Sequence, residues 1–218
     1  MPLIVKDTSK DGAGFEPISS GMHHSVCYAV IDIGTQPQTG QYPSRRKVVI
    51  CWETTDERID IEKDGKKVSL PRAISAKYTL SLAQKGNLRP MLESWRGRPF
   101  SDQELDGFDI GALVGANCFL NVVHKNGVGE KAKNVYANVA SVNPLPKGMA
   151  KVKPENPTIL FSMDDFEGPV TIPAGIPEWI EGLIKQSDEY LAKAQTANAP
   201  APAQQDAANG APVDDVPF

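Results

Sequence analysis

Basic and aromatic side chains gather in two segments of the sequence that also contain several glycines or prolines. The first, "PQTGQYPSRRK" (37–47), precedes an apolar run, and the second, "HKNGVGEKAKNVY" (124–136), lies between two such runs. Cationic side chains can contact phosphates and flat side chains can stack on unpaired bases, a combination that is typical of surfaces for single-stranded nucleic acid. The candidate residues for such a surface are Tyr42, Arg45, Arg46, Lys47, Trp52, Lys77, Tyr78, Lys125, Lys131, Lys133 and Tyr136.

Several of these candidates also fit a purely structural role. Trp52 alternates with Val48 and Ile50 along an apolar run, which favours burial in a core over stacking on a base. Tyr78 shares its strand face with apolar neighbours, so burial is again the favoured interpretation. Tyr42 and Tyr136 lie near expected loops and are the better stacking candidates. The lysines could form an ordinary solvated surface, and the informative observation is therefore the pair of basic loops.

Other chemistry is less well supported by the sequence. The stretch "HHSVC" suggests zinc, but on a strand His23 and His24 point to opposite faces, and no fourth ligand follows at a suitable spacing. The glycines of "NGVGEK" do not have the spacing of a phosphate-binding loop. We therefore expect a protein without enzymatic activity, metal or cofactor. A metal-dependent nuclease that uses the acidic turn of Asp164, Asp165 and Glu167 is the less favoured alternative.

The elements that must position these residues are mainly strands. β-Rich runs separated by turn-forming residues precede and follow a helical stretch in which Leu88, Met91, Leu92 and Trp95 share one face. Gly97 is placed to end that helix. The expected strands are 23–36, 45–54, 73–82, 117–126 and 134–145, with a hairpin turn at 63–67, a helix at 87–98 and a second short helix within 101–115.

About five strands, with a helix between the third and the fourth, are typical of a small Greek-key barrel. We therefore predict a mainly β, OB-fold-like domain over residues 1–175. In an OB-fold the face of the second and third strands, together with the loops after the first and fourth strands, forms the ligand groove. The two basic loops are then expected to flank one groove.

The end of the chain has a different composition. Residues 176–195 predict one helix that packs on the body, because Pro177 and Glu178 suit its start and Ile180 and Ile184 fall on one stripe. Residues 196–218 contain mostly Ala, Pro, Gln, Asn and Gly, and this composition predicts a disordered linker.

The charge is distributed unevenly between these parts. The chain of 218 residues has a formal net charge of −4, and from Asp188 onward it carries five acidic residues and one basic residue. The preceding body is therefore neutral, so the mildly acidic total does not argue against an anionic ligand. The sequence contains no apolar run that could cross a membrane and no secretory pattern at its start. The three separated cysteines indicate reduced thiols in a cytoplasmic protein.

The last residues, "DDVPF", resemble the C-terminal tip of bacterial-type single-stranded DNA-binding proteins. In that family an OB-fold binds DNA, a disordered linker follows, and the acidic tip recruits replication and repair enzymes. The resemblance implies a partner-binding tip, with a shorter acidic run than usual, made of Asp214, Asp215, Val216, Pro217 and Phe218.

The body resembles a group of bacteriophage proteins often labelled as replication or single-stranded DNA-binding proteins. The resemblance covers residues 26–179 and is carried by "YTLSLAQKGNLRPMLESWRGRPF", "LVGANCFLNVVH" and "PLPKGM". It implies a phage protein that works in the cytoplasm of the bacterial host, protects single strands during replication or recombination, and recruits partners through its tip. The alternative is a protein-interaction adaptor without DNA binding of its own. A homo-oligomer is compatible with both.

Overall fold

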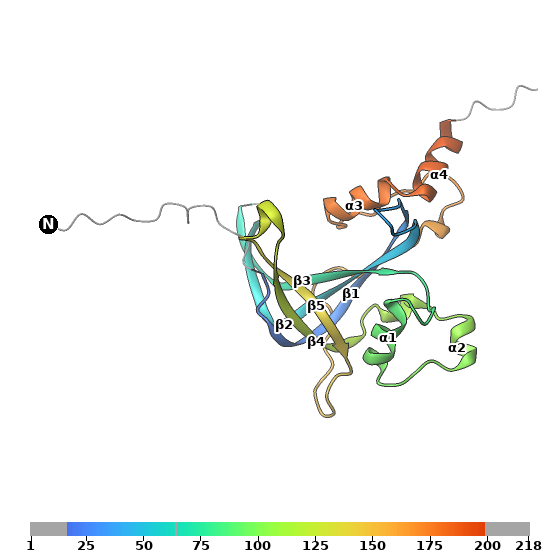
Figure 1. Ribbon diagram of the computed structural model, residues 1–218. Coiled ribbons are helices and arrows are strands. Elements are labelled where there is room, and N and C mark those ends of the chain that lie inside the picture. The colour runs from blue at the N-terminus through green and yellow to red at the C-terminus, as the bar shows by residue number, and fades with distance from the viewer. Residues whose placement is uncertain (1–16, 64, 199–218) are drawn as a thin grey trace, which may run out of the picture.

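The computed structural model describes residues 17–63 and 65–198, and its body is a curled, mainly antiparallel sheet (Figure 1). The strand order is β3-β2-β1-β4-β5, and a short sixth strand pairs with β1 in parallel. The strands are β1 (Gly21–Gln36), β2 (Arg45–Lys63), β3 (Lys66–Thr79), β4 (Asn117–Asn126), β5 (Val135–Asn143) and β6 (Ile159–Phe161). The prediction of a mainly β chain is confirmed, whereas β6 was not predicted.

Helices interrupt the sheet at two points in the sequence. The helix predicted between the third and fourth strands is present, and a capping box formed by Ser101 and Glu104 starts the short helix that follows it. The helices are α1 (Leu88–Arg96), α2 (Asp102–Asp106), α3 (Glu178–Lys185) and α4 (Asp188–Asn198), and single turns occur at η2 (Ile110–Leu113), η3 (Gly129–Lys131) and η4 (Met163–Asp165). None of the helices in the described part of the chain is long and apolar enough to span a membrane.

The predicted single C-terminal helix is in fact two helices, α3 and α4. The break falls at the buried Ser187, whose hydroxyl donates to the carbonyl of Ile184 and accepts a hydrogen bond from the backbone of Tyr190. The side chain thus caps both helix ends at the break. Both helices pack against β1, as expected for the C-terminal helical segment.

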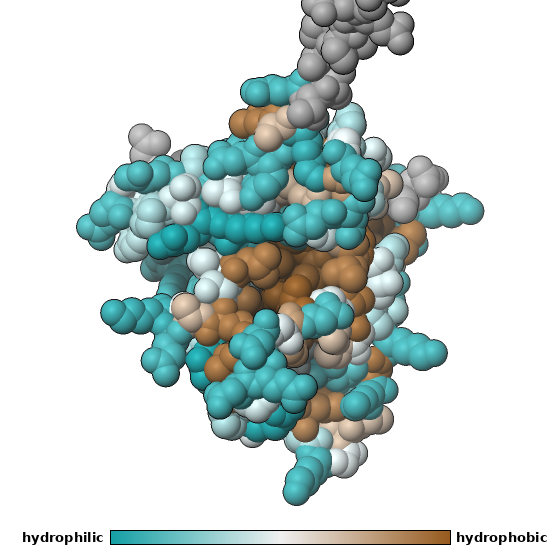
Figure 2. Space-filling view, turned by 90° about the vertical axis from the view of Figure 1, so that its right-hand side faces the viewer, coloured by the Kyte–Doolittle hydropathy of each residue, from teal (hydrophilic) through white to brown (hydrophobic). Residues whose placement is uncertain are grey.

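The sheet is covered on both faces. On its inner face, Trp52 of β2 packs on Trp95 of α1, with ring centroids 5.9 Å apart, and the predicted apolar face of α1 fills this core. On the outer face, Ile31 and Val49 pack against α3 and β6. Figure 2 shows apolar surface exposed between the two helical layers, α3 and α4 above and α1 and α2 below. Because β1 and β2 are buried on both sides, they form the rigid centre of the molecule.

A buried carboxylate fixes the long connection between β5 and β6 to the sheet. Glu53, which is 2% exposed, accepts hydrogen bonds from the backbone of Glu155 and from the backbone and side chain of Asn156. Arg58 forms a second, exposed attachment through a bidentate ion pair with Glu155. These contacts hold the connection against the outer face of β2.

A second carboxylate attaches α4 to the end of β1. Glu189 accepts hydrogen bonds of 2.6 Å from the backbone and from the hydroxyl of Thr35. Burial raises the pKa of Glu189, but the hydrogen bonds from Thr35 outweigh that effect and hold the pKa below its ordinary value.

We expect the stabilisation from Glu189 to be lost in acid. Because its pKa is lower in the folded than in the unfolded chain, the contribution is fully present above the unfolded value of about 4.3 and disappears as the pH falls through the lower, folded value. Urea unfolding of the native chain and of Glu189→Gln over a pH series measures this. The stability difference should be constant near neutrality and shrink below about pH 4. A difference that grows on acidification would contradict this role.

Candidate nucleic-acid interface

Two β-hairpins separate from one another where β1 begins. β1 pairs with β4 over Gly21–Val26 and with β2 only from Ser25 onward, while both neighbouring strands continue past the start of β1. Residues 58–71 of β2 and β3 therefore project as one hairpin, which we call the β2–β3 arm. Residues 123–138 project as a second, which we call the β4–β5 arm. Both arms extend from the same end of the sheet (Figure 1).

A cleft of about 520 Å³ lies at the base of the two arms. Its lining residues come from the segment before β1 and from both arms or their bases: Pro17, Ser19, Glu57, Arg72, His124 and Val135. We call this space the inter-arm cleft. Segments more than a hundred residues apart in the sequence thus meet at one site.

The floor of the inter-arm cleft is formed by residues 17–20, which side chains hold in place. Ser19 donates from its backbone (3.1 Å) and its hydroxyl to the carboxylate of Glu57. The carbonyl of Ser19 lies 2.9 Å from Nε2 of His23, and that of Ile18 lies 2.7 Å from Nε2 of His124. The other ring nitrogen of His23 lies 2.9 Å from Asp56. The chain immediately before β1 is therefore fixed between the arms.

On the β2–β3 side the cleft is lined by the charged side chains of Glu57 and Arg72, and an aliphatic face of the arm extends beyond them. Arg72 lines the cleft, so Leu70 and Val68, at alternate positions of the same strand, lie on that face. Their cross-strand partners, Ile59 and Ile61, share the face. These four side chains are half-buried or nearly so, whereas Asp60, Glu62 and Ser69 lie on the other face and are exposed. On the opposite arm the wall is formed by His124 and by Val135, which is 43% exposed.

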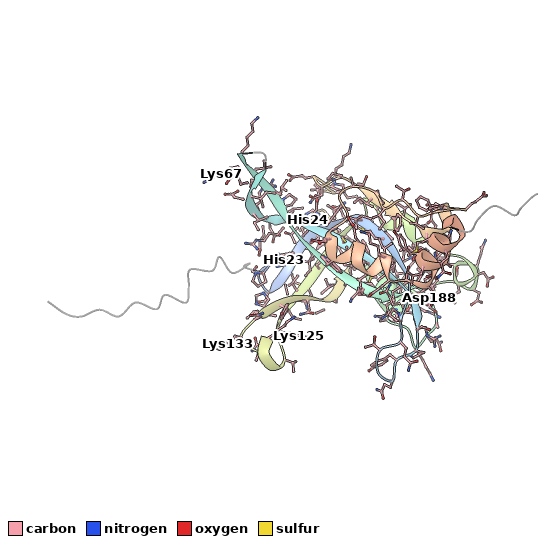
Figure 3. The ribbon with its side chains drawn as sticks, turned by 90° about the horizontal axis from the view of Figure 1, so that it is seen from above. His23, His24, Lys67, Lys125, Lys133 and Asp188 are labelled. Carbon is pink, nitrogen blue, oxygen red and sulfur yellow. The ribbon has the colours of Figure 1, made fainter. Side chains whose placement is uncertain are left out.

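Exposed lysines lie on both arms. Figure 3 shows Lys67 at the tip of the β2–β3 arm and Lys125 and Lys133 on the β4–β5 arm, with His23 between them and Asp188 at the far end of the molecule. None of the exposed arm lysines forms an ion pair with another described residue; they are Lys66, Lys67, Lys125, Lys131 and Lys133. Each arm thus carries exposed lysines that form no ion pair with a described residue, and the cleft lies at the base of both arms.

The basic loop after β1 does not flank this cleft. Residues 37–44 follow the C-terminal end of β1, next to α4, whereas the β4–β5 arm lies beyond the start of β1. A strand of 16 residues, about 50 Å long when extended, separates the two loops. Tyr42, which is 70% exposed, Arg45 and Lys47 therefore lie far from the arms. The expectation that the two basic loops flank one groove is wrong for this sheet.

Arg46 is engaged within the protein. Its guanidinium contacts Asp32 at 2.5 Å and Asp164 at 2.8 Å, and the hydrogen bond that it donates to Asp32 raises the pKa of Arg46 above its ordinary value. Asp32 is 5% exposed and also accepts from the backbone of Met163. Arg46 therefore joins β1, β2 and the turn after β6, and its charge is already balanced by carboxylates.

Two predicted aromatic contacts lie in the core. Trp52 is fully buried and Tyr78 is 8% exposed, so neither ring can stack on a base without disrupting the packing around α1. Burial also raises the pKa of Tyr78 to about 12. Lys77, next to Tyr78, is exposed on the opposite face of β3.

Tyr136 and Lys125 keep the exposure that their predicted role requires. They are cross-strand partners on the β4–β5 arm, and Tyr136 is 44% exposed. Because His124 and Val135 line the cleft, the alternation of the strands places Lys125 and Tyr136 on the outer face of this arm. Both side chains are therefore open to solvent on that face.

The acidic turn and the histidines are used structurally. Asp164 pairs with Arg46, and His24 contacts the side chain of Asn117 at 2.9 Å. Cys27 is buried in the inner core, which raises the pKa of its thiol. Among residues 17–63 and 65–198, no group of three or more His, Cys, Asp or Glu side chains is placed to hold a metal ion. The tip, Asp214 to Phe218, lies outside the described residues.

Comparison with known proteins adds no identification. No protein-family model, curated protein or solved structure matches this chain.

The structural role of Arg46 can be separated from a DNA-binding role. Arg46→Ala should lower the free energy of unfolding by about 2 to 3 kcal/mol, because it leaves the buried carboxylate of Asp32 without its cationic partner. Arg45 is exposed and forms no ion pair with a described residue, so Arg45→Ala should change stability by less than about 0.5 kcal/mol. Urea unfolding of the two variants measures the difference, and equal losses would contradict the structural role of Arg46.

Proposed function

We propose that this protein binds single-stranded DNA, with little dependence on sequence and without catalysis, between its two arms. The observation that carries the proposal is the inter-arm cleft between two arms whose exposed lysines form no ion pair with a described residue. Phosphates are attracted to the lysines, and unpaired bases can lie against the aliphatic face of the β2–β3 arm or on the exposed ring of Tyr136.

The aliphatic face of the β2–β3 arm favours single strands over duplex DNA. In a duplex the faces of the bases are stacked on one another and offer nothing to an apolar wall, whereas a single strand exposes them. One face of the β2–β3 arm is formed by Ile59, Ile61, Val68 and Leu70, and aliphatic side chains do not distinguish one base from another through hydrogen bonds. Sequence-tolerant binding follows from this composition.

The strand order supports an OB-fold-like barrel for the body. In an OB-fold the first strand pairs with the second and the fourth, the second with the third, and the fourth with the fifth. Each of these pairings occurs here, while β3 and β5 form no ladder in the described part of the chain. A cavity of about 390 Å³ between them is lined from β3, α1 and β5. We therefore interpret the body as an OB-fold barrel that is open at this seam.

The resemblance of the sequence to phage single-stranded DNA-binding proteins adds a cellular context to the proposal. The protein would coat exposed strands during phage replication or recombination in the bacterial host, and the tip of Asp214 to Phe218 would recruit a replication or recombination protein. A terminal aromatic ring can enter an apolar pocket of such a partner while the adjacent carboxylates pair with its basic residues.

Deleting Val216 to Phe218 should separate these two roles. The deletion leaves the arms and the acidic residues Asp214 and Asp215 in place, so the affinity for oligo-dT should stay within about twofold of the native value. Fluorescence anisotropy with labelled oligo-dT at fixed salt measures this. A large loss of affinity would show that the tip belongs to the DNA-binding surface.

Neutralising the β4–β5 arm should weaken binding and flatten its salt dependence. The triple variant Lys125→Ala, Lys131→Ala and Lys133→Ala removes three phosphate contacts, so the slope of log K against log salt should fall in magnitude by about 2 and the affinity at low salt by about tenfold or more. Anisotropy titration of oligo-dT at several salt concentrations gives both quantities.

A matched control is available in the connection between β5 and β6. Lys147, Lys151 and Lys153 are exposed, and the triple alanine variant changes the net charge by the same amount away from the arms. This control should leave the slope nearly unchanged. Equal effects of the two triple variants would indicate an unspecific response to net charge and would contradict binding between the arms.

A further inference from the structure

A second cavity lies along the boundary between β3 and β5, beside α1. Its volume is about 390 Å³, and it is lined by Tyr78 of β3, by the face of α1 that includes Met91 and Ser94, and by residues 139–142 of β5. We call it the seam cavity. None of the described residues that line it is charged. Its volume falls within the range of small-molecule sites, which is about 300 to 1,000 Å³.

A buried hydroxyl at the wall of the seam cavity lacks a partner. Tyr78 is 8% exposed, and its hydroxyl forms no hydrogen bond with any described residue. Buried polar groups of native proteins are nearly always hydrogen-bonded, so an exception requires an explanation. Because burial raises the pKa of Tyr78 to about 12, the hydroxyl keeps its proton at neutral pH. It can therefore donate a hydrogen bond to a ligand in the cavity.

The rest of the lining suits a flat, uncharged ring. Met91 and Val139 present apolar surface, and Asn87 and Ser94 place an amide and a hydroxyl at the exposed rim. A nucleobase has apolar faces and an edge of hydrogen-bond donors and acceptors, which match this lining. Its phosphate would stay outside the cavity. Lys85, two residues before Asn87, is exposed and forms no ion pair with a described residue.

The seam cavity and the inter-arm cleft lie along the same boundary between strands. Arg72 of β3 and Val135 of β5 line the cleft, whereas Tyr78 and Val139 of the same two strands line the seam cavity. Arg72 and Tyr78 share one face of β3, because an even number of positions separates them. The strand between them is about 20 Å long. A single strand of DNA laid along this boundary can therefore reach both sites.

We propose that the seam cavity binds an uncharged nucleobase whose edge accepts a hydrogen bond from the hydroxyl of Tyr78. The single strand held between the arms supplies this base, and that part rests on the proposed DNA-binding function. The ring of Tyr78 is packed in the inner core, so the contact is with its hydroxyl and not with its face. The seam cavity thus gives the bound strand a second point of attachment beyond the cleft.

Titration with thymidine, which carries no phosphate, tests the nucleobase site independently of the arms. In NMR spectra of the isotope-labelled full chain, millimolar thymidine should shift the amides of residues 87–94 and 139–142 in a saturable way, and deoxyribose should not. Tyr78→Phe should weaken thymidine binding about three- to tenfold, since it removes one hydrogen bond. Urea unfolding should show native stability for this variant, because the hydroxyl has no partner in the free chain.

Tyr28→Phe is the matched control for this titration. Tyr28 is a partly buried tyrosine that packs against the outer core, away from the seam cavity, so this variant should bind thymidine as the native chain does. Unshifted amides at the seam cavity, or equal thymidine affinity in Tyr78→Phe and the native chain, overturn the nucleobase site.

Oligo-dT titration of the same variants tests whether the bound strand supplies the base. Ser94→Phe places a ring at the rim of the cavity from an exposed position of α1, and both this variant and Tyr78→Phe should bind oligo-dT about threefold more weakly or worse. Thymidine binding without any change in oligo-dT affinity in these variants overturns the supply of the base by the strand. If even the native chain does not bind oligo-dT, the proposed function is wrong, and the thymidine titration still decides the nucleobase site.

Discussion

The candidate interface depends on the point at which β1 begins. β1 is the central strand, and its first paired residue, Gly21, has a φ of 135°, a value that glycine adopts far more readily than other residues. Before this turn the chain leaves the sheet and lies on the cleft floor, while β2 and β4 continue without a strand between them. Had β1 continued, it would have filled the space between its neighbours, and one wide sheet would have replaced the two arms.

The opposite end of the sheet is closed by ionic and hydrophobic contacts. Arg46 connects Asp32 with Asp164, Glu189 holds α4 to Thr35, and the outer core packs α3 against the same strands. On the arms, Lys66, Lys67, Lys125, Lys131 and Lys133 form no ion pair with a described residue, and the aliphatic face of the β2–β3 arm is half-buried. The end of the sheet next to α3 and α4 is therefore held by more of these contacts than the arms are. This division is compatible with the proposed binding site on the arms, since binding sites are often drawn from less stable regions.

The sequence predicted the elements with strong periodicity and missed those that depend on tertiary contacts. The apolar stripe of α1 predicted its buried face correctly. The alternation in "RIDIEK" and "KKVSL" around a turn could have revealed the full β2–β3 arm, although these stretches read as short and polar. β6, with three residues, has too little local signal and forms because β1 offers it an edge. The separation of the two basic loops follows from the course of β1, which local sequence patterns do not encode.

The most direct test of the account is the location of bound DNA on the sheet. Hydrogen–deuterium exchange of the native chain, with and without saturating oligo-dT, reports both ends of β1 in one experiment. If DNA binds between the arms, oligo-dT should slow amide exchange at residues 58–71 and 123–138 and leave exchange in the loop 37–44 unchanged. Protection of residues 37–47 with unchanged exchange in the arms would contradict it.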